Sequence, residues 1–303
     1  MRRRDQIITS NSLRFARAAL YHTLTIVSKL SLFIASLTFG SQLSPKSQIS
    51  SPPESLDRSR PTPALRQSIN LRLEMAENVS TRCFPKALAD SFKPGEKSLA
   101  LRDIHSPIAS NTPFFHFANI PAIGGERVRL THLCRHWVSG TSFSFRGVKL
   151  EFTPEDVAIL LGLPKRGLEP TTGELQIAGD CTILTRYFDG RSPTVDQIKS
   201  KMLEIRENDE LAEDYVRLWV MYIFAALLFT DGWQRAPIYV NVLVDNLEEL
   251  NNYDWPTAIH RYTAEGIYRY RKAGNTTYLK GCPVLLTVSG STTLVFCLLF
   301  ACS

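Results

Sequence analysis

The chain has 303 residues, of which 44% are hydrophobic and 21% are charged, and its net charge is +6. This length and hydrophobic content suffice for one substantial core with unstructured ends, or for two small domains, and neither needs a disulfide scaffold. The six cysteines never occur at Cys-x-x-Cys spacing, which argues against a zinc ribbon or a dithiol redox motif. The small positive excess favours acidic partners such as nucleic acid only weakly.

Residues 1–111 are predicted to form a disordered, low-complexity leader. An apolar run over 18–43 contains a charge-free part about as long as a signal-peptide core, which is too short to span a bilayer. A Ser/Pro-rich stretch over 44–66 follows, and it cannot bury enough apolar surface to order itself. Folded structure is predicted to begin between about residues 112 and 126.

The folded part, residues 112–288, is predicted to be mainly α with a short β-hairpin, an α+β domain. Apolar positions recur at helical spacing over 126–137. Phe143 and Phe145 alternate with polar residues, and so do the apolar positions over 148–152. These two runs flank Arg146-Gly147, so they predict a hairpin.

Residues Thr153–Pro164 carry the start and stop signals of a short helix. Thr153 suits the N-cap and Pro154 the first helical position, while Gly162 suits a left-handed C-terminal end. The apolar face, Val157, Leu160 and Leu161, is predicted to pack on a buried helix over 213–230.

The second half is predicted to be helical. An amphipathic helix is expected over 195–208, and the 213–230 helix is apolar nearly all round, which is typical of a buried helix. A short helix is expected over 241–250. Asp254 is predicted to cap a last helix that starts at Trp255 and runs to about Lys272.

Catalytic chemistry finds little support in the sequence. His132, Cys134 and His136 alternate, but residues two apart on a helix point about 200° from each other, so they cannot share a metal. The acidic run over 204–214 is interpreted as a solvated helix end. No phosphate-binding loop or nucleophile motif is present. We therefore expect no catalytic, cofactor-binding or metal-binding residue, no cofactor and no enzymatic activity.

The last helix offers the best nucleic-acid candidates, because basic residues beside aromatic ones can pair with phosphates and stack on bases. These residues are His260, Arg261, Arg269, Tyr270, Arg271 and Lys272. The alternative is that these cations offset the helix dipole and the tyrosines line the edge of a core. Lys149, Lys165 and Arg166 form a weaker second group.

Several motifs, in order, resemble the plant mobile domain, also called the aminotransferase-like plant mobile domain, which includes the MAIN-like proteins. They are Leu133–Trp137, Thr141–Phe145, Phe152–Pro164, Thr172-Gly173, Asp214–Asp231, Tyr253–Ala258 and Leu279–Leu286. The resemblance covers roughly residues 125–288. A related plant domain found beside SUMO-protease modules shares parts of the pattern.

The resemblance implies a non-enzymatic, transposon-derived plant nuclear protein. Such proteins act in meristem maintenance and gene silencing, here through protein or nucleic-acid interactions. The chain departs from the family after Val288, so residues 289–303 are predicted to be a non-native apolar tail of a truncated copy.

Two alternatives remain open. One is a transposase-associated nucleic-acid-binding domain that uses the last helix. The other is a membrane anchor through residues 18–43 or 281–303. We expect protein partners first and nucleic acid second, and neither a membrane nor a small molecule.

Overall fold

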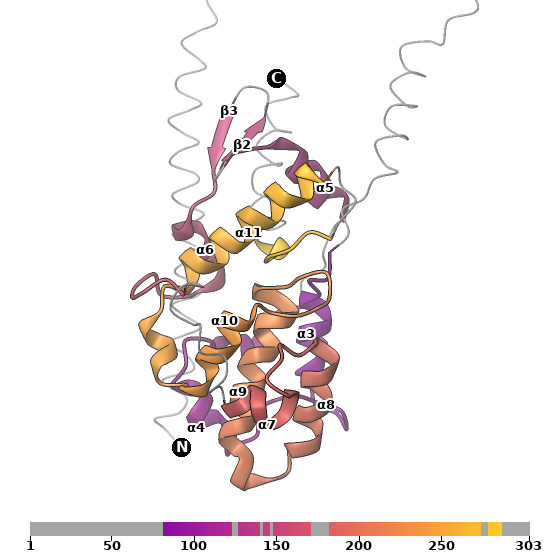
Figure 1. The fold of residues 1–303 in the computed structure, drawn as a ribbon, viewed down its shortest axis with the longest axis vertical. Coiled ribbons are helices and arrows are strands. Elements are labelled where there is room, and N and C mark those ends of the chain that lie inside the picture. The colour runs from indigo at the N-terminus through magenta and orange to yellow at the C-terminus, as the bar shows by residue number, and fades with distance from the viewer. Residues whose placement is uncertain are drawn as a thin grey trace, which may run out of the picture. The chain divides into compact units, whose positions relative to one another are not determined.

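The computed structural model describes residues 81–122, 127–139, 142–145, 148–170, 182–273 and 278–286. Helices dominate these residues, and a small antiparallel sheet of three strands accompanies them (Figure 1). This confirms the predicted class, mainly α with a short β-hairpin. The predicted leader up to residue 80 and the tail from residue 289 lie outside the described residues.

The helical elements follow one another closely along the chain. In order they are α3 (Pro85–Ser91), α4 (His105–Ser110), the 3-10 helix η1 (Phe115–Asn119), α5 (Arg127–His136), α6 (Pro154–Leu161), α7 (Thr182–Phe188), α8 (Val195–Ile205), the 3-10 helix η3 (Asp209–Leu211), α9 (Ala212–Ile223), the π-helix η4 (Phe224–Leu228), α10 (Ile238–Asn241), the 3-10 helices η5 (Val242–Asp245) and η6 (Glu249–Asn252), and α11 (Trp255–Lys272). The strands are β1 (Trp137–Ser139), β2 (Ser142–Phe145) and β3 (Val148–Glu151).

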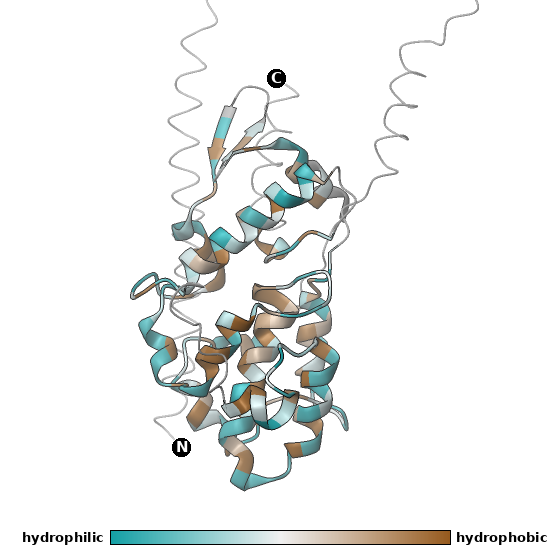
Figure 2. Ribbon diagram, in the orientation of Figure 1, coloured by the Kyte–Doolittle hydropathy of each residue, from teal (hydrophilic) through white to brown (hydrophobic). Residues whose placement is uncertain are grey.

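The core is built around α9 and its continuation η4. Val216 and residues 218–224 are at most 3% exposed. Figure 2 shows mostly apolar colours along this element. The prediction of a buried helix over 213–230 is confirmed. The last turn widens into a π-helix, in which the N–H of Phe229 donates to the carbonyl of Phe224 at 2.8 Å.

The predicted start of the folded domain, between about 112 and 126, is wrong. Leu88 and Leu99 are fully buried, and the Cys83 Sγ lies 3.6 Å from the carbonyl oxygen of Leu227. Helix α3 packs on η4, and α4 packs on α9. Residues 81–111 have short apolar stretches without clear periodicity, so only their tertiary contacts reveal that they belong to the core.

The predicted hairpin is confirmed, and it has a third strand. Phe143 pairs with Leu150 across β2 and β3. Trp137 belongs to β1, one residue beyond α5, rather than to the helix. Its ring meets that of Phe143 at 4.6 Å, edge to face, which is a favourable aromatic geometry.

Helix α6 has the predicted ends but a different partner. The Thr153 hydroxyl accepts from the Asp156 N–H in a capping box, and Gly162 has a φ of +67°. However, α6 packs mainly on α11 rather than on the 213–230 helix, and Leu160 is only partly buried (Figure 1). The surface of α9 is already covered by α4, α8 and η5, so α6 docks elsewhere.

The later helices match the predictions except over 241–250. Helices α8 and α11 occupy the predicted segments, and the Asp254 carboxylate accepts from the Thr257 N–H at 3.1 Å. The segment over 241–250 is broken into α10, η5 and η6. Helix α7 was not predicted at all.

Candidate functional site

Two of the six predicted nucleic-acid contacts on α11 are buried. His260 is 6% exposed, and its Nε2 lies 2.9 Å from the carbonyl oxygen of Phe152. Burial lowers the pKa of His260, against the opposing effect of that hydrogen bond. Tyr270 is 3% exposed. Burial therefore argues against a nucleic-acid contact at His260, which serves the core, and leaves Tyr270 little surface to offer a partner.

The other four predicted residues are exposed, and two of them already have acidic partners. The Arg261 Nε lies 3.1 Å from Glu169 Oε1, and its guanidinium donates to the carbonyl of Pro170. Arg269 pairs with Glu265 one turn earlier. Arg271 and Lys272 are exposed in the last turn of α11.

Arg271 also lines a small cleft between α5 and α11, with a volume of about 230 Å³. This α5–α11 cleft is lined by Thr131, Cys134, Arg135, Tyr270 and Arg271. Arg135 is exposed, so the fold brings two cations from distant segments to one opening. Sequence reasoning missed Arg135 as a site residue, since nothing local indicates that α5 packs on α11.

The weaker predicted group does not form a comparable cluster. Lys149 lies 3.7 Å from Glu151, and Lys165 lies 2.6 Å from Glu155, so each has an acidic neighbour. Arg166 is exposed. The α5–α11 cleft and the adjoining end of α11 are therefore the better candidate surface for an acidic partner.

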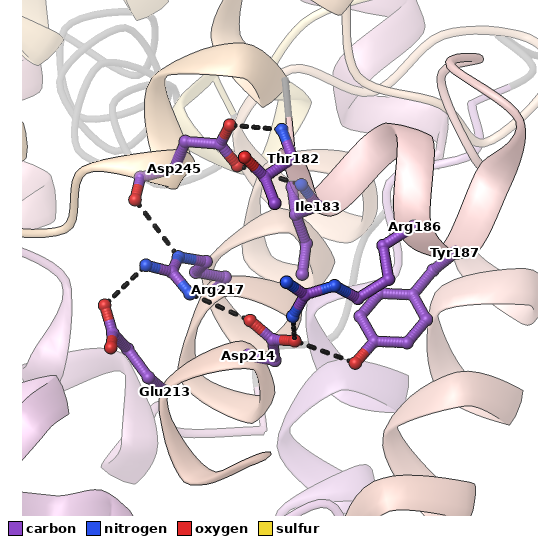
Figure 3. Close-up of polar contacts among 8 residues, drawn as sticks. All are labelled: Thr182, Ile183, Arg186, Tyr187, Glu213, Asp214, Arg217 and Asp245. Atoms are coloured by element: carbon purple, nitrogen blue, oxygen red, sulfur yellow. Dashed lines mark hydrogen bonds and ion pairs between the residues drawn. The ribbon is translucent and has the colours of Figure 1, made fainter. Parts of the chain in front are cut away.

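A buried carboxylate lies at the centre of a second polar cluster, which joins α7 and α9 (Figure 3). The Asp214 side chain is 5% exposed. It accepts hydrogen bonds at 2.8 Å from both the Tyr187 hydroxyl and the Arg217 guanidinium, and it also pairs with Arg186. The interpretation of the 204–214 run as a solvated helix end is thus wrong for Asp214.

The cluster extends to η5 through Arg217 and Asp245. The Arg217 Nε donates to the main-chain carbonyl of Asp245 at 3.1 Å. The Asp245 carboxylate accepts from the N–H groups of Thr182 and Ile183, at 2.5 and 3.0 Å. Asp245 thereby caps the free N-terminal donors of α7 from 62 and 63 residues away. We call these contacts the Asp214 network (Figure 3).

The electrostatics of Asp214 suit a structural role better than a catalytic one. Burial acts to raise the pKa of Asp214, but hydrogen bonds from Tyr187, Arg186 and Arg217 together lower it below its ordinary value. A general base needs a pKa near the working pH and access to a substrate proton. This carboxylate is saturated with donors and stays ionised, so it pins α7 to α9.

Two buried cysteines and a buried histidine are also withdrawn from solvent. Burial raises the pKa of the Cys83 and Cys134 thiols to about 12, with Arg271 opposing it at Cys134, so neither thiol is a ready nucleophile. His105 is fully buried and stacks on Tyr215 at 4.1 Å. Burial, helped by Arg102, lowers the pKa of His105 to about 4.

No metal-binding group of three or more His, Cys, Asp or Glu side chains occurs within the described part of the chain. The side chain of His132 is outside the described atoms. No helix among the described residues is long and apolar enough to cross a membrane. Residues 18–43 and 287–303 of the two predicted anchors lie outside the described ranges.

The chain belongs to a family described as a domain of unknown function (DUF8566), whose model matches residues 135–287, just over half of the sequence. No curated protein and no solved structure matches the chain. The matched residues contain the α5 end, the sheet, the Asp214 network and α11. Helices α3 and α4, which complete the core, precede the match.

Proposed function

We propose that this DUF8566 domain is a non-enzymatic interaction module that contacts nucleic acid through the α5–α11 cleft and the end of α11. In line with its resemblance to the plant mobile domain, we place its action in the plant nucleus. There it would act as a transposon-derived protein in meristem maintenance or gene silencing. A protein partner with an acidic surface is the alternative occupant of the same cations.

One observation carries the proposal: Arg135 and Arg271 come from separate helices and line one cleft, beside the exposed Lys272. Cations in the last turns of α5 and α11 also offset the negative ends of their own helix dipoles, but that effect does not require Arg135 and Arg271 to line one cleft. Phosphate groups are the natural partners of clustered guanidinium groups.

The proposal that this domain is not an enzyme rests on the hydrogen bonding and burial of the side chains that could act in catalysis. The carboxylate of Asp214 is saturated by Tyr187, Arg186 and Arg217. Two buried thiols have raised pKa values, which keep them neutral. These groups contribute to folding, which favours a function carried by the surface.

Fluorescence anisotropy with a labelled 20-base-pair DNA of mixed sequence tests the contact, using the full-length protein at 50 to 300 mM salt. We expect binding that weakens with salt, because phosphate contacts release counterions. In the variant R271Q/K272Q the slope of log K against log[salt] should fall by about 1.8, which corresponds to about 0.9 for each lost phosphate contact.

The matched control is K86Q/R191Q, which removes two exposed cations outside the α5–α11 cleft. It changes the net charge equally and should leave the slope nearly unchanged. Absence of binding at 50 mM salt, or equal losses in both variants, would reject nucleic-acid contact at this cleft. Imaging of the tagged full-length protein in plant cells tests the nuclear assignment, and exclusion from nuclei would reject it.

A further inference from the structure

A larger cavity, of about 430 Å³, lies between α3 and α8. Tyr222 and Ala226, from α9 and η4, also line it, as do Leu88 of α3 and Val195 of α8. Its volume is within the range of about 300–1,000 Å³ that is typical of small-molecule sites. We call it the α3–α8 cavity. Its lining shares no residue with the α5–α11 cleft.

Hydrogen bonds between distant segments hold the walls of this cavity in place. The Phe84 N–H donates to the carbonyl of Ala226 at 3.4 Å, and the Val195 N–H donates to the carbonyl of Gln234 at 3.0 Å. The hydroxyl groups of Ser91 and Tyr222 lie 3.0 Å apart. The cavity is therefore built by the fold itself, and a ligand would not have to order its walls.

One wall contains a strained turn. Gln234 has a φ of +57°, in the left-handed region that non-glycine residues rarely adopt. The Asp231 carboxylate holds the turn by accepting from the N–H groups of Trp233 at 2.7 Å and Arg235 at 2.9 Å. Trp233, next to Gln234, is 78% exposed. Backbone strain of this kind persists where the surroundings impose it, often at ligand sites.

The cavity is lined by cations that lack acidic partners. Arg82, Lys97 and Lys199 line it, and none of them forms an ion pair within the described residues. Arg82 stacks on the Tyr278 ring at 4.8 Å, and its buried Nε has no hydrogen-bond partner among the described atoms. Of the two lining carboxylates, Asp90 is paired with Lys93 outside the lining, and Asp196 is exposed.

We propose that the α3–α8 cavity binds a small organic anion. The apolar body of the ligand would lie against Leu88 and Ala226, and its carboxylate or phosphate head would pair with Lys97 and Lys199. This site is independent of the nucleic-acid contact proposed for the α5–α11 cleft. The residues that line the cavity are scattered from 82 to 234, so no local sequence pattern indicates this site.

Two dyes of similar shape test the proposal on the full-length protein. The first is 8-anilinonaphthalene-1-sulfonate, which is anionic, and the second is N-phenyl-1-naphthylamine, which is neutral. Fluorescence titration should show that K97Q/K199Q weakens binding of the anionic dye by about tenfold or more, because charge-assisted bonds are lost. Binding of the neutral dye should change less than twofold.

A control variant removes one cation from α3 and one from α8, both outside the lining; of these, Lys201 pairs with Glu204. In K86Q/K201Q both dyes should bind within twofold of the unmodified protein. A87W, at an exposed position of the lining, should fill the cavity and abolish binding of both dyes while leaving the melting temperature nearly unchanged. Equal weakening in both double variants, or retained binding in A87W, overturns the proposal.

Competition identifies the head group. Phenyl phosphate and phenylacetate are each titrated against the bound anionic dye, together with neutral benzyl alcohol. Displacement by either anion, and not by the alcohol, supports the proposal and shows whether a phosphate or a carboxylate is preferred. Failure of both anions to displace the dye, or equal displacement by the alcohol, rejects it.

Discussion

The Asp214 network and the α5–α11 cleft use the same residue types in opposite ways. In the network a carboxylate with 5% exposure meets two guanidinium groups and a phenol, and these contacts join α7 to α9 (Figure 3). In the cleft two arginines line an opening at the surface. Buried charges must be paired to be tolerated, whereas exposed charges are also stabilised by solvent. The number of charges therefore says less about function than their burial does.

The largest expected effect comes from breaking the buried side of this comparison. D214A removes the acceptor that Arg186, Tyr187 and Arg217 share, and should lower the free energy of unfolding by about 3 kcal/mol. Urea denaturation measures this loss. The control E213A removes an exposed partner of Arg217 and should cost less than about 1 kcal/mol. Equal losses of the free energy of unfolding in D214A and E213A would show that the burial of Asp214 does not add to its stabilising effect.

An intermediate effect is expected from acid titration of the core. Burial lowers the pKa of His105 to about 4, below the value of about 6.5 in the unfolded chain, so the unfolded state binds the proton more readily. This stabilising contribution is fully present above about pH 6.5, and is lost as the pH falls towards 4. Between pH 7 and 5 the free energy of unfolding should fall by about 1–2 kcal/mol.

The variant H105F isolates this contribution, because phenylalanine can keep the stacking on Tyr215 without titrating. Stability measured against pH should fall less steeply in H105F between pH 7 and 5. Some slope should remain, because burial also lowers the pKa values of His116 and His260. An unchanged slope would assign the acid sensitivity to residues other than His105.

The smallest effect on stability is expected at the exposed side of the comparison. R271Q/K272Q removes two exposed cations from the last turn of α11, where they offset the negative end of the helix dipole. Thermal unfolding should show a loss of about 1 kcal/mol or less. A loss as large as that of D214A would mean that these residues hold the fold together rather than serve a partner.

Local signals decided several elements of this protein. The ends of α6 are set by Thr153, Pro154 and Gly162, and the start of α11 is set by Asp254. These ends are local features, because caps depend on neighbouring backbone groups. The continuous apolar character of 213–230 marked α9 and η4 as buried. The alternation around Arg146-Gly147 was enough for the hairpin, since strand pairing across a short turn is also local.

The candidate sites could be predicted only in part. Arg271 and Lys272 were recognised from the basic and aromatic pattern of the last helix, but His260 and Tyr270 in the same pattern turned out to be buried. Arg135 joined the cleft only through the packing of α5 on α11. Periodicity reports which face of a helix is apolar, but not which neighbour covers it.

Some features of this protein follow from local sequence, and others depend on contacts between distant segments. The helix ends, the hairpin and the buried segment follow from local patterns, because those signals lie within a few residues of one another. The docking of α6 on α11, the inclusion of residues 81–111 and the capping of α7 by Asp245 all join segments far apart in the chain. Burial, partner and charge state are properties of such long-range contacts, so the roles of Asp214, Arg135 and the α3–α8 cavity emerge only in the folded chain.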